Sequence, residues 1–243
     1  MTPADPHFWL LVLTSFVASA ISGAFAIGGG FLMLAVIAAF LPVSSVVPMH
    51  SVLMLGTSVG RWWFFWPFIQ WRIVVPFVLG CVIGAPLGAR VYLTLPEMVI
   101  ALVVGIFMLG AVWMPPVPWN IPLRHPFFVV GILHSFLSAM FSFGGVMQPL
   151  IMRTSLDKMQ IIATLAVSLL FMNLAKIGGY VMFGFDFRPY LLLIVTAMVA
   201  GVAGAGVGRQ LAERVPEEKF RLVFKAIMTA LAVRLLYRAW TLA

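Results

Sequence analysis

Eight long apolar blocks occupy most of this 243-residue sequence, and they constrain its fold more than any other feature. A helix needs about 20 apolar residues to cross the hydrocarbon core of a bilayer. Backbone groups left unpaired in lipid cost several kcal/mol each, so apolar blocks of this length must be helical. The sequence therefore predicts an all-α polytopic membrane protein. The eight blocks span residues 8–41, 47–69, 73–92, 98–114, 127–152, 159–185, 190–208 and 220–242.

The composition excludes most other classes of protein. Hydrophobic residues make up 63% of the chain and charged residues 9%, whereas about a quarter of the residues in soluble domains are charged. These values exclude a soluble enzyme or DNA-binding domain. The net charge of +8 comes from Lys and Arg residues that mostly stand singly at the ends of apolar blocks, as in cytoplasmic loops of membrane proteins. We therefore expect a multi-pass protein of the cell membrane, surrounded by lipid and without a nucleic-acid partner.

The chain divides into two similar halves. A proline-rich connector, 115–126, separates repeat 1 (8–114) from repeat 2 (127–242) within a single transmembrane domain over 1–243. Equivalent positions lie roughly 115 to 120 residues apart, and matches in the same order indicate an internal duplication. The matching segments are 22–30 with 138–146, Trp71-Arg72 with Phe187-Arg188, Gly84-x-x-x-Gly88 with Gly204-x-x-x-Gly208, and Pro96-Glu97 with Pro216-Glu217.

Two topologies fit this duplication. Glycines interrupt the first block at Gly28, Gly29 and Gly30, and the fifth at Gly144 and Gly145. If all eight blocks cross the membrane, the pseudo-symmetric halves are parallel. If the two glycine-broken blocks are re-entrant, each half has three crossings and the halves form an inverted repeat. The re-entrant topology collects more Lys and Arg on one side, so the positive-inside rule favours the inverted repeat, with both termini on the outside face.

The acidic residues all lie outside the apolar interiors. Cation transporters and many proton pumps depend on intramembrane carboxylates. The apolar blocks of this sequence contain no carboxylate in their interiors, which argues against a metal or Na⁺ site. The lone Cys81 excludes a cysteine cluster and an internal disulfide. The sequence therefore predicts no metal site and no cofactor. The acidic residues are Asp5, Glu97, Asp157, Asp186, Glu213, Glu217 and Glu218.

Two cations fall inside apolar blocks at matching positions of the two halves. Arg61 follows Ser58 by three residues, and Lys176 follows Asn173 by three. This spacing places each polar residue and its cation on one helix face, one turn apart. A lone cation of this kind more often extends to the membrane interface, which the neighbouring tryptophans make plausible for Arg61. Because the pattern is duplicated, we interpret the cations as a functional pair for anion binding.

The glycine breaks indicate the second part of an anion site. Where a helix stops at Gly28 to Gly30 or at Gly144 and Gly145, freed N–H groups and the positive end of a half-helix can face an anion. Glycine-interrupted segments at corresponding places in two halves are typical of a transporter binding site. We expect the two breaks to meet near mid-membrane, because only a shared cavity tolerates non-helical backbone there.

Three further residues are candidates for the same site. His50 opens the second block, and His134 lies about three turns before the second glycine break. Either histidine could hydrogen-bond an anion, carry a proton or simply bridge two helices. Gln148, which follows the second break, could donate its amide hydrogens to an oxyanion.

The chain resembles the sulfite exporter TauE/SafE family over nearly its whole length. The resemblance rests on the two glycine-broken segments, 22–30 and 138–145, on the block IGAPLGAR at 83–90, and on the two-half plan. It implies an integral membrane transporter of small sulfur oxyanions such as sulfite, sulfoacetate or related organosulfonates. The second half departs from the glycine triplet at Val146, so the two broken segments are not strictly equivalent.

Other functions stay open on the sequence alone. An anion channel could use the same cations and helix ends, and counterflow would separate it from a carrier. A membrane enzyme or assembly factor is a further alternative, but no nucleophile with a base, carboxylate pair or metal set is clustered here, so we expect no enzyme activity. The sequence fixes neither the exact substrate nor the oligomeric state, and it leaves a homodimer open. Because an inside-negative potential drives anions outward, we expect export across the inner membrane.

Overall fold

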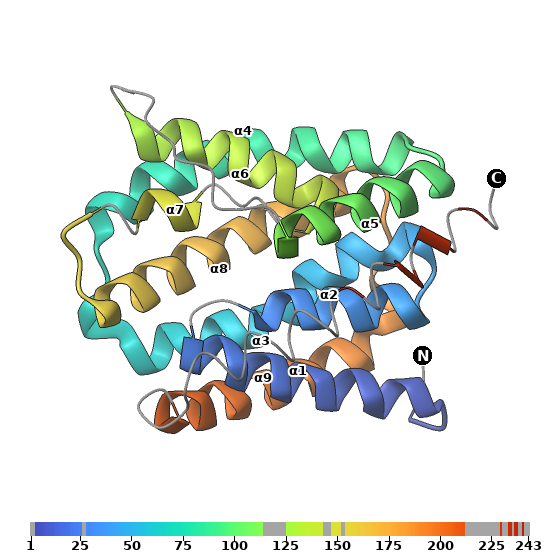
Figure 1. Cartoon of the computed structure of the whole chain (residues 1–243), viewed down its shortest axis with the longest axis horizontal. Helices are drawn as coiled ribbons and strands as arrows, with labels where there is room; N and C mark the ends of the chain where they lie inside the picture. The colour runs from blue at the N-terminus through green and yellow to red at the C-terminus, as the bar shows by residue number, and fades with distance from the viewer. Residues whose placement is uncertain are drawn as a thin grey trace.

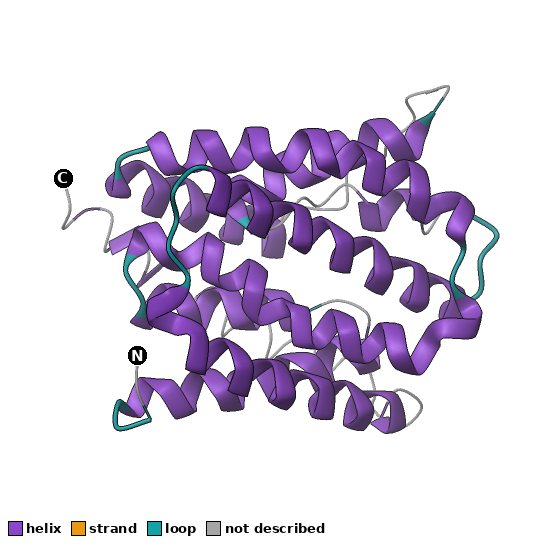
Figure 2. Ribbon diagram, turned by 180° about the vertical axis from the view of Figure 1, so that it is seen from behind, coloured by secondary structure: helices purple, strands orange, loops and turns teal. Residues whose placement is uncertain are grey.

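The computed structural model describes residues 3–25, 28–113, 125–142, 147–151 and 154–211, together with residues 229, 233, 234, 236, 237 and 240. Figure 2 shows helices and connecting loops, with no strand among these residues. Most of the connector and most of the eighth apolar block lie outside them. The predicted all-helical fold is confirmed for the part of the chain that the structure describes.

The helices follow the apolar blocks closely. The first block forms two helices, α1 and α2, which are separated at the glycine triplet as the sequence predicts. The fifth block likewise forms α6 and the short α7. The helices are α1 (Pro6–Phe25), α2 (Gly29–Phe40), α3 (Val46–Phe65), α4 (Trp71–Thr94), α5 (Glu97–Trp113), α6 (Pro126–Phe141), α7 (Met147–Ile151), α8 (Lys158–Met182) and α9 (Leu191–Leu211).

By length and composition, several of these helices can cross a membrane. Five candidate spans correspond to α1, α3, α4, α8 and α9, whereas α2, α6 and the described apolar part of α5 are shorter. The α3 span is 89% buried within the protein, compared with 39–61% for the other four. The chain is therefore a polytopic membrane protein in which α3 is the central helix.

Helices from the two halves of the chain pack against each other. Helix α1 lies along α9, α6 lies along α4, and α3 contacts both α8 and α9 (Figure 1). A Cβ at Gly84 would overlap the Ile132 carbonyl oxygen of α6, and one at Gly204 would overlap the Phe16 carbonyl oxygen of α1. Small residues thus allow the close backbone approach that drives helix association in lipid.

The two helices of the first glycine-broken block pack against each other. The rings of His7 and Phe40 lie 4.8 Å apart, so the start of α1 and the end of α2 share one end. Figure 1 shows α2 running back beside α1 in this way. In the second half, Val130 near the start of α6 and Ile151 at the end of α7 belong to one hydrophobic cluster. In each block, residues near the start of the first helix and near the end of the second belong to one hydrophobic cluster.

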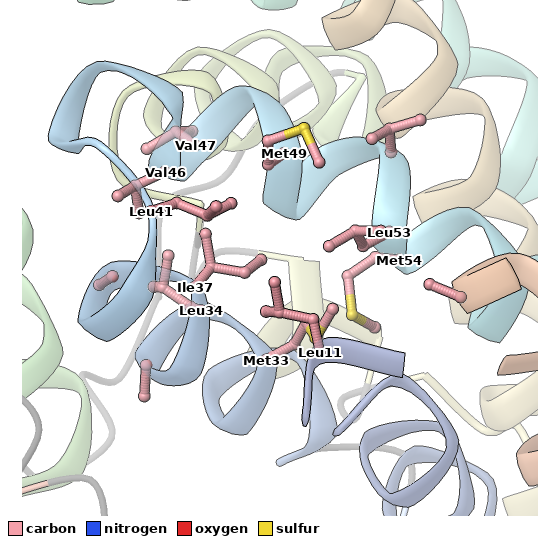
Figure 3. Packing of buried hydrophobic residues seen from close by; sticks show 14 of the residues in the cluster. Leu11, Met33, Leu34, Ile37, Leu41, Val46, Val47, Met49, Leu53 and Met54 are labelled. Atoms are coloured by element: carbon pink, nitrogen blue, oxygen red, sulfur yellow. The ribbon is translucent and has the colours of Figure 1, made fainter. Parts of the chain in front are cut away.

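A large hydrophobic core holds α2 against α3. Figure 3 shows apolar side chains of both helices pointing toward one another, with Leu11 of α1 beside them. Burying each such side chain contributes about 1.5–3 kcal/mol relative to water, although lipid reduces that contrast for a membrane protein. This packing brings the start of α2, including Gly30, onto His50 of α3.

Candidate functional site

The two cations singled out from the sequence are both buried. Arg61 of α3 is 2% exposed and Lys176 of α8 is 0% exposed. Their partners in the sequence pattern, Ser58 and Asn173, are buried as well. Neither side chain therefore extends to the membrane interface. Each charge must be compensated within the protein or by a ligand.

Arg61 has hydrogen-bond donors that nothing in the described part of the chain satisfies. Its Nε and Nη1 atoms are buried and have no partner there. The ion pair found among the described residues joins His7 to Asp5, close to the N-terminus and far from Arg61 in sequence. A guanidinium offers planar N–H groups that match two oxygens of an oxyanion. Its unpartnered donors therefore fit an anionic ligand.

Other buried donors in the described part of the chain also lack hydrogen-bond partners. Buried atoms without a partner among the described residues include the hydroxyls of Thr57, Ser142 and Ser168 and the indole N–H of Trp62. Thr57 and Ser168 come from α3 and α8, the helices that carry the cations. An unpaired buried polar group costs about 1–3 kcal/mol. An interior rich in unpaired donors favours a ligand that accepts hydrogen bonds.

Lys176 has a different environment from Arg61. Its Nζ donates to Ser138 Oγ at 3.2 Å, and Ser138 stands near the end of α6, just before the second glycine break. Ser138 follows His134 by four residues on α6, so Lys176 contacts the face of α6 that carries this histidine. Arg61 lies on α3, and its Nε and Nη1 atoms have no partner among the described residues.

The two histidines hold the backbone of the broken segments. His50 Nε2–H donates to the Gly30 carbonyl at 2.9 Å, and the Met147 N–H donates to His134 Nδ1 at 3.1 Å. Each bond ties the first turn of the helix after a break, α2 or α7, to a neighbouring helix. His50 Nδ1 is buried and has no partner among the described residues. The sequence left anion binding, proton transfer and helix bridging open, and the geometry supplies the bridging contact for both histidines.

The three glycines of the first break have distinct roles. Gly28 has φ 112°, a conformation that L side chains rarely adopt. A Cβ at Gly29 would overlap the Ala18 carbonyl oxygen and Ser22 Oγ of α1. A Cβ at Gly30 would lie 3.7 Å from His50 Nε2. Gly28 therefore makes the turn and Gly29 lets α2 approach α1, whereas a Cβ at position 30 would make only an ordinary van der Waals contact.

The structure describes the residues on either side of the second break but not the break itself. Gly144 and Gly145 lie outside the described residues, as does the side chain of Gln148, whose backbone belongs to α7. The expected meeting of the two breaks therefore stays a prediction. Ser142, directly before the break, has φ 64°, so the chain leaves α6 through a left-handed residue.

Four residues that carry buried polar atoms, Ser138, Thr57, Ser168 and Trp62, were not among the candidates selected from the sequence. Ser138 belongs to the duplicated glycine motif and could have been found there. Thr57 lies one turn before Arg61, and Ser168 lies two turns before Lys176, so helical spacing from the cations would have selected both. Trp62 gave no such signal, because tryptophans are common at membrane interfaces for other reasons.

Together, the helical bundle and its long apolar helices define a class, a multi-pass membrane protein. The chain belongs to the sulfite exporter TauE/SafE family, whose family model matches residues 11–235. Members of this family are membrane transporters of sulfite-type anions rather than enzymes. The resemblance noted in the sequence is confirmed. A search of curated proteins and a search of solved structures each find no significant match.

Proposed function

We propose that this protein exports a small sulfur-containing oxyanion, such as sulfite or an organosulfonate, across the inner membrane. The observation that carries the proposal is the buried guanidinium of Arg61, whose Nε and Nη1 donors have no partner among the described residues. In a low-dielectric interior an unpaired cation is costly, and a bound oxyanion with several acceptor oxygens would offset that cost. Lys176, Ser58 and Asn173 complete the proposed set of binding residues.

We also propose that the two halves form an inverted repeat with re-entrant α1–α2 and α6–α7 segments. The packing supports this, because α1 against α9 and α6 against α4 are equivalent pairs under the internal duplication. The close contacts of Gly204 with Phe16 and of Gly84 with Ile132 follow the same correspondence. An inverted repeat is a common plan of secondary transporters, which alternate access by moving one repeat against the other.

The membrane potential is the simplest driving force for this transport. The described spans contain no carboxylate that could bind Na⁺ or relay protons. One elementary charge gains about 2.3 kcal/mol per 100 mV, so a dianion could be driven outward against roughly a thousandfold gradient. We therefore expect electrogenic export.

Proteoliposomes loaded with labelled sulfite and clamped with K⁺ and valinomycin test this proposal. Efflux should accelerate when the sulfite-containing compartment is made negative, and empty liposomes should show no such effect. Unlabelled sulfite on the opposite side should accelerate exchange in a carrier but not in a channel. A rate that ignores the potential and follows an imposed pH gradient would instead favour proton coupling through His50 or His134.

A further inference from the structure

The two buried cations lie at different levels of the protein. Helices α3 and α8 pack side by side and run in opposite directions (Figure 1). At one end, Tyr180 of α8 packs edge-to-face against Tyr92, whose hydroxyl donates to the Val43 carbonyl just before α3. At the other end, the Gln70 N–H, after α3, donates to Thr164 Oγ1 near the start of α8.

The position of each cation follows from these contacts. Lys176 lies one turn before Tyr180, and therefore toward the end of the molecule where α3 begins. Phe65, one turn after Arg61 on α3, belongs to a hydrophobic cluster that includes Val167 of α8. Nine residues of α8 separate Val167 from Lys176, which corresponds to about 14 Å at 1.5 Å per residue. Matching positions in antiparallel helices thus place the cations apart along the α3–α8 interface.

Hydrogen bonding separates the two positions as well. Lys176 donates to Ser138, whereas Arg61 has two unpartnered nitrogen atoms among the described residues. A single small oxyanion spans only a few ångströms, so it cannot neutralise both cations at once.

We propose that this protein binds two anions in series, one at Arg61 and one at Lys176. The inference rests on the proposed function and specifies how its site is organised. The Arg61 position offers a planar fork for two oxygens of the anion, and the Lys176 position offers a point charge beside Ser138. Two anions held in line repel each other, so each one promotes the release of the other, as in multi-site channels. Transport then proceeds from one position to the next along α3 and α8.

Binding stoichiometry of the purified full chain tests this inference. We expect equilibrium dialysis with [³⁵S]sulfite under argon to give about two sulfite ions per chain. Arg61→Gln and Lys176→Gln should each reduce this number to about one, and the double variant should bind none. Arg90→Gln and Arg209→Gln serve as matched controls, because both arginines are exposed, and they should keep the wild-type stoichiometry. Size-exclusion chromatography of every variant identifies any that fails to fold.

The outcomes separate this inference from the proposed function. One sulfite per wild-type chain, lost in either single variant, would show a single shared site and overturn the inference while leaving the proposed function intact. If a variant does not fold, the wild-type stoichiometry alone still decides between one site and two. Wild-type protein that binds no sulfite, sulfate or sulfoacetate would overturn both proposals.

Discussion

At the scale of single residues, the interior of this protein is defined by unpaired donors. Arg61, Thr57, Trp62 and Ser168 all have buried polar atoms without a partner among the described residues. Natural proteins rarely leave such groups unsatisfied, and exceptions have a reason. The chain belongs to a family of anion transporters, and under the proposed function an anion in the interior accepts these hydrogen bonds.

Replacing Arg61 should reduce transport, and the loss should be larger the more of its hydrogen-bonding capacity the new side chain lacks. Arg61→Gln removes the charge, and hydrogen bonds to a charged group contribute about 1.5–3 kcal/mol, so we expect about a 10- to 100-fold loss of sulfite efflux. Arg61→Lys keeps a positive charge but loses the planar guanidinium, so its rate of sulfite efflux should lie between those of the wild type and Arg61→Gln. Arg90→Gln, at an exposed position, is the control. Unchanged efflux in Arg61→Gln would remove Arg61 from the site.

A substitution at Gly28 should destabilise the first break. A side chain at φ 112° costs about 1–3 kcal/mol, so Gly28→Ala should lower the thermal midpoint in detergent by several degrees. Gly178→Ala in α8 is the matched control, because a Cβ there meets no atom within 4 Å and alanine favours a helix. Equal midpoints for the two variants would show that the turn at Gly28 is not strained by a side chain.

At the scale of elements, helix pairs from different halves depend on close backbone contact. Ser15 and Ser19 of α1 donate to the carbonyl oxygens of Ala197 and Gly201 of α9, so hydrogen bonds reinforce the contact at Gly204. Bonds of this kind between membrane helices contribute about 0.6 kcal/mol on average. The shape of the small-residue surface is therefore the larger requirement for pairing.

Enlarging Gly204 should separate α1 from α9. A Cβ at Gly204 would overlap the backbone of Phe16, which cannot move without shifting the whole helix, so Gly204→Ala should lower stability by about 1–3 kcal/mol. Gly206→Ala is a control on the same helix, because its Cβ would meet only the ring of Phe64, at 3.3 Å. Thermal unfolding followed by size-exclusion chromatography compares them. A Gly206→Ala variant that loses as much stability as Gly204→Ala would contradict this account.

At the scale of the whole molecule, the connecting loops fall at two ends. Gln70 and Thr164 meet at one end, whereas Leu95, Phe185 and Phe187 join one hydrophobic cluster at the other. If the broken segments are re-entrant, these ends face opposite sides of the membrane. The proposed inverted repeat therefore makes a direct prediction of sidedness.

Labelling of single cysteines with a membrane-impermeant maleimide measures this sidedness. Cys81 is buried, so the wild-type chain should give little background. Ser155 and Asp186 are exposed and lie near opposite ends. By the positive-inside rule, Ser155→Cys should react only from the cytoplasmic side and Asp186→Cys only from outside. Reaction of both cysteines from the same side would contradict the topology.

The sequence by itself determined the fold class, the helix positions, the break at Gly28 to Gly30 and the family, because each depends on local pattern. Apolar length requires helices in lipid, and a glycine triplet weakens a helix wherever it occurs. It also selected Arg61 and Lys176 as the cations inside the apolar blocks, both of which the structure buries. Only the tertiary structure decided how these residues are distributed. Matching positions in the sequence suggest a pair at one place, but α3 and α8 pack antiparallel, so the same positions come to lie at different levels of the interface. The partners of the histidines were decided in the same way, since Gly30 and Met147 reach His50 and His134 only through the packing of helices around the breaks.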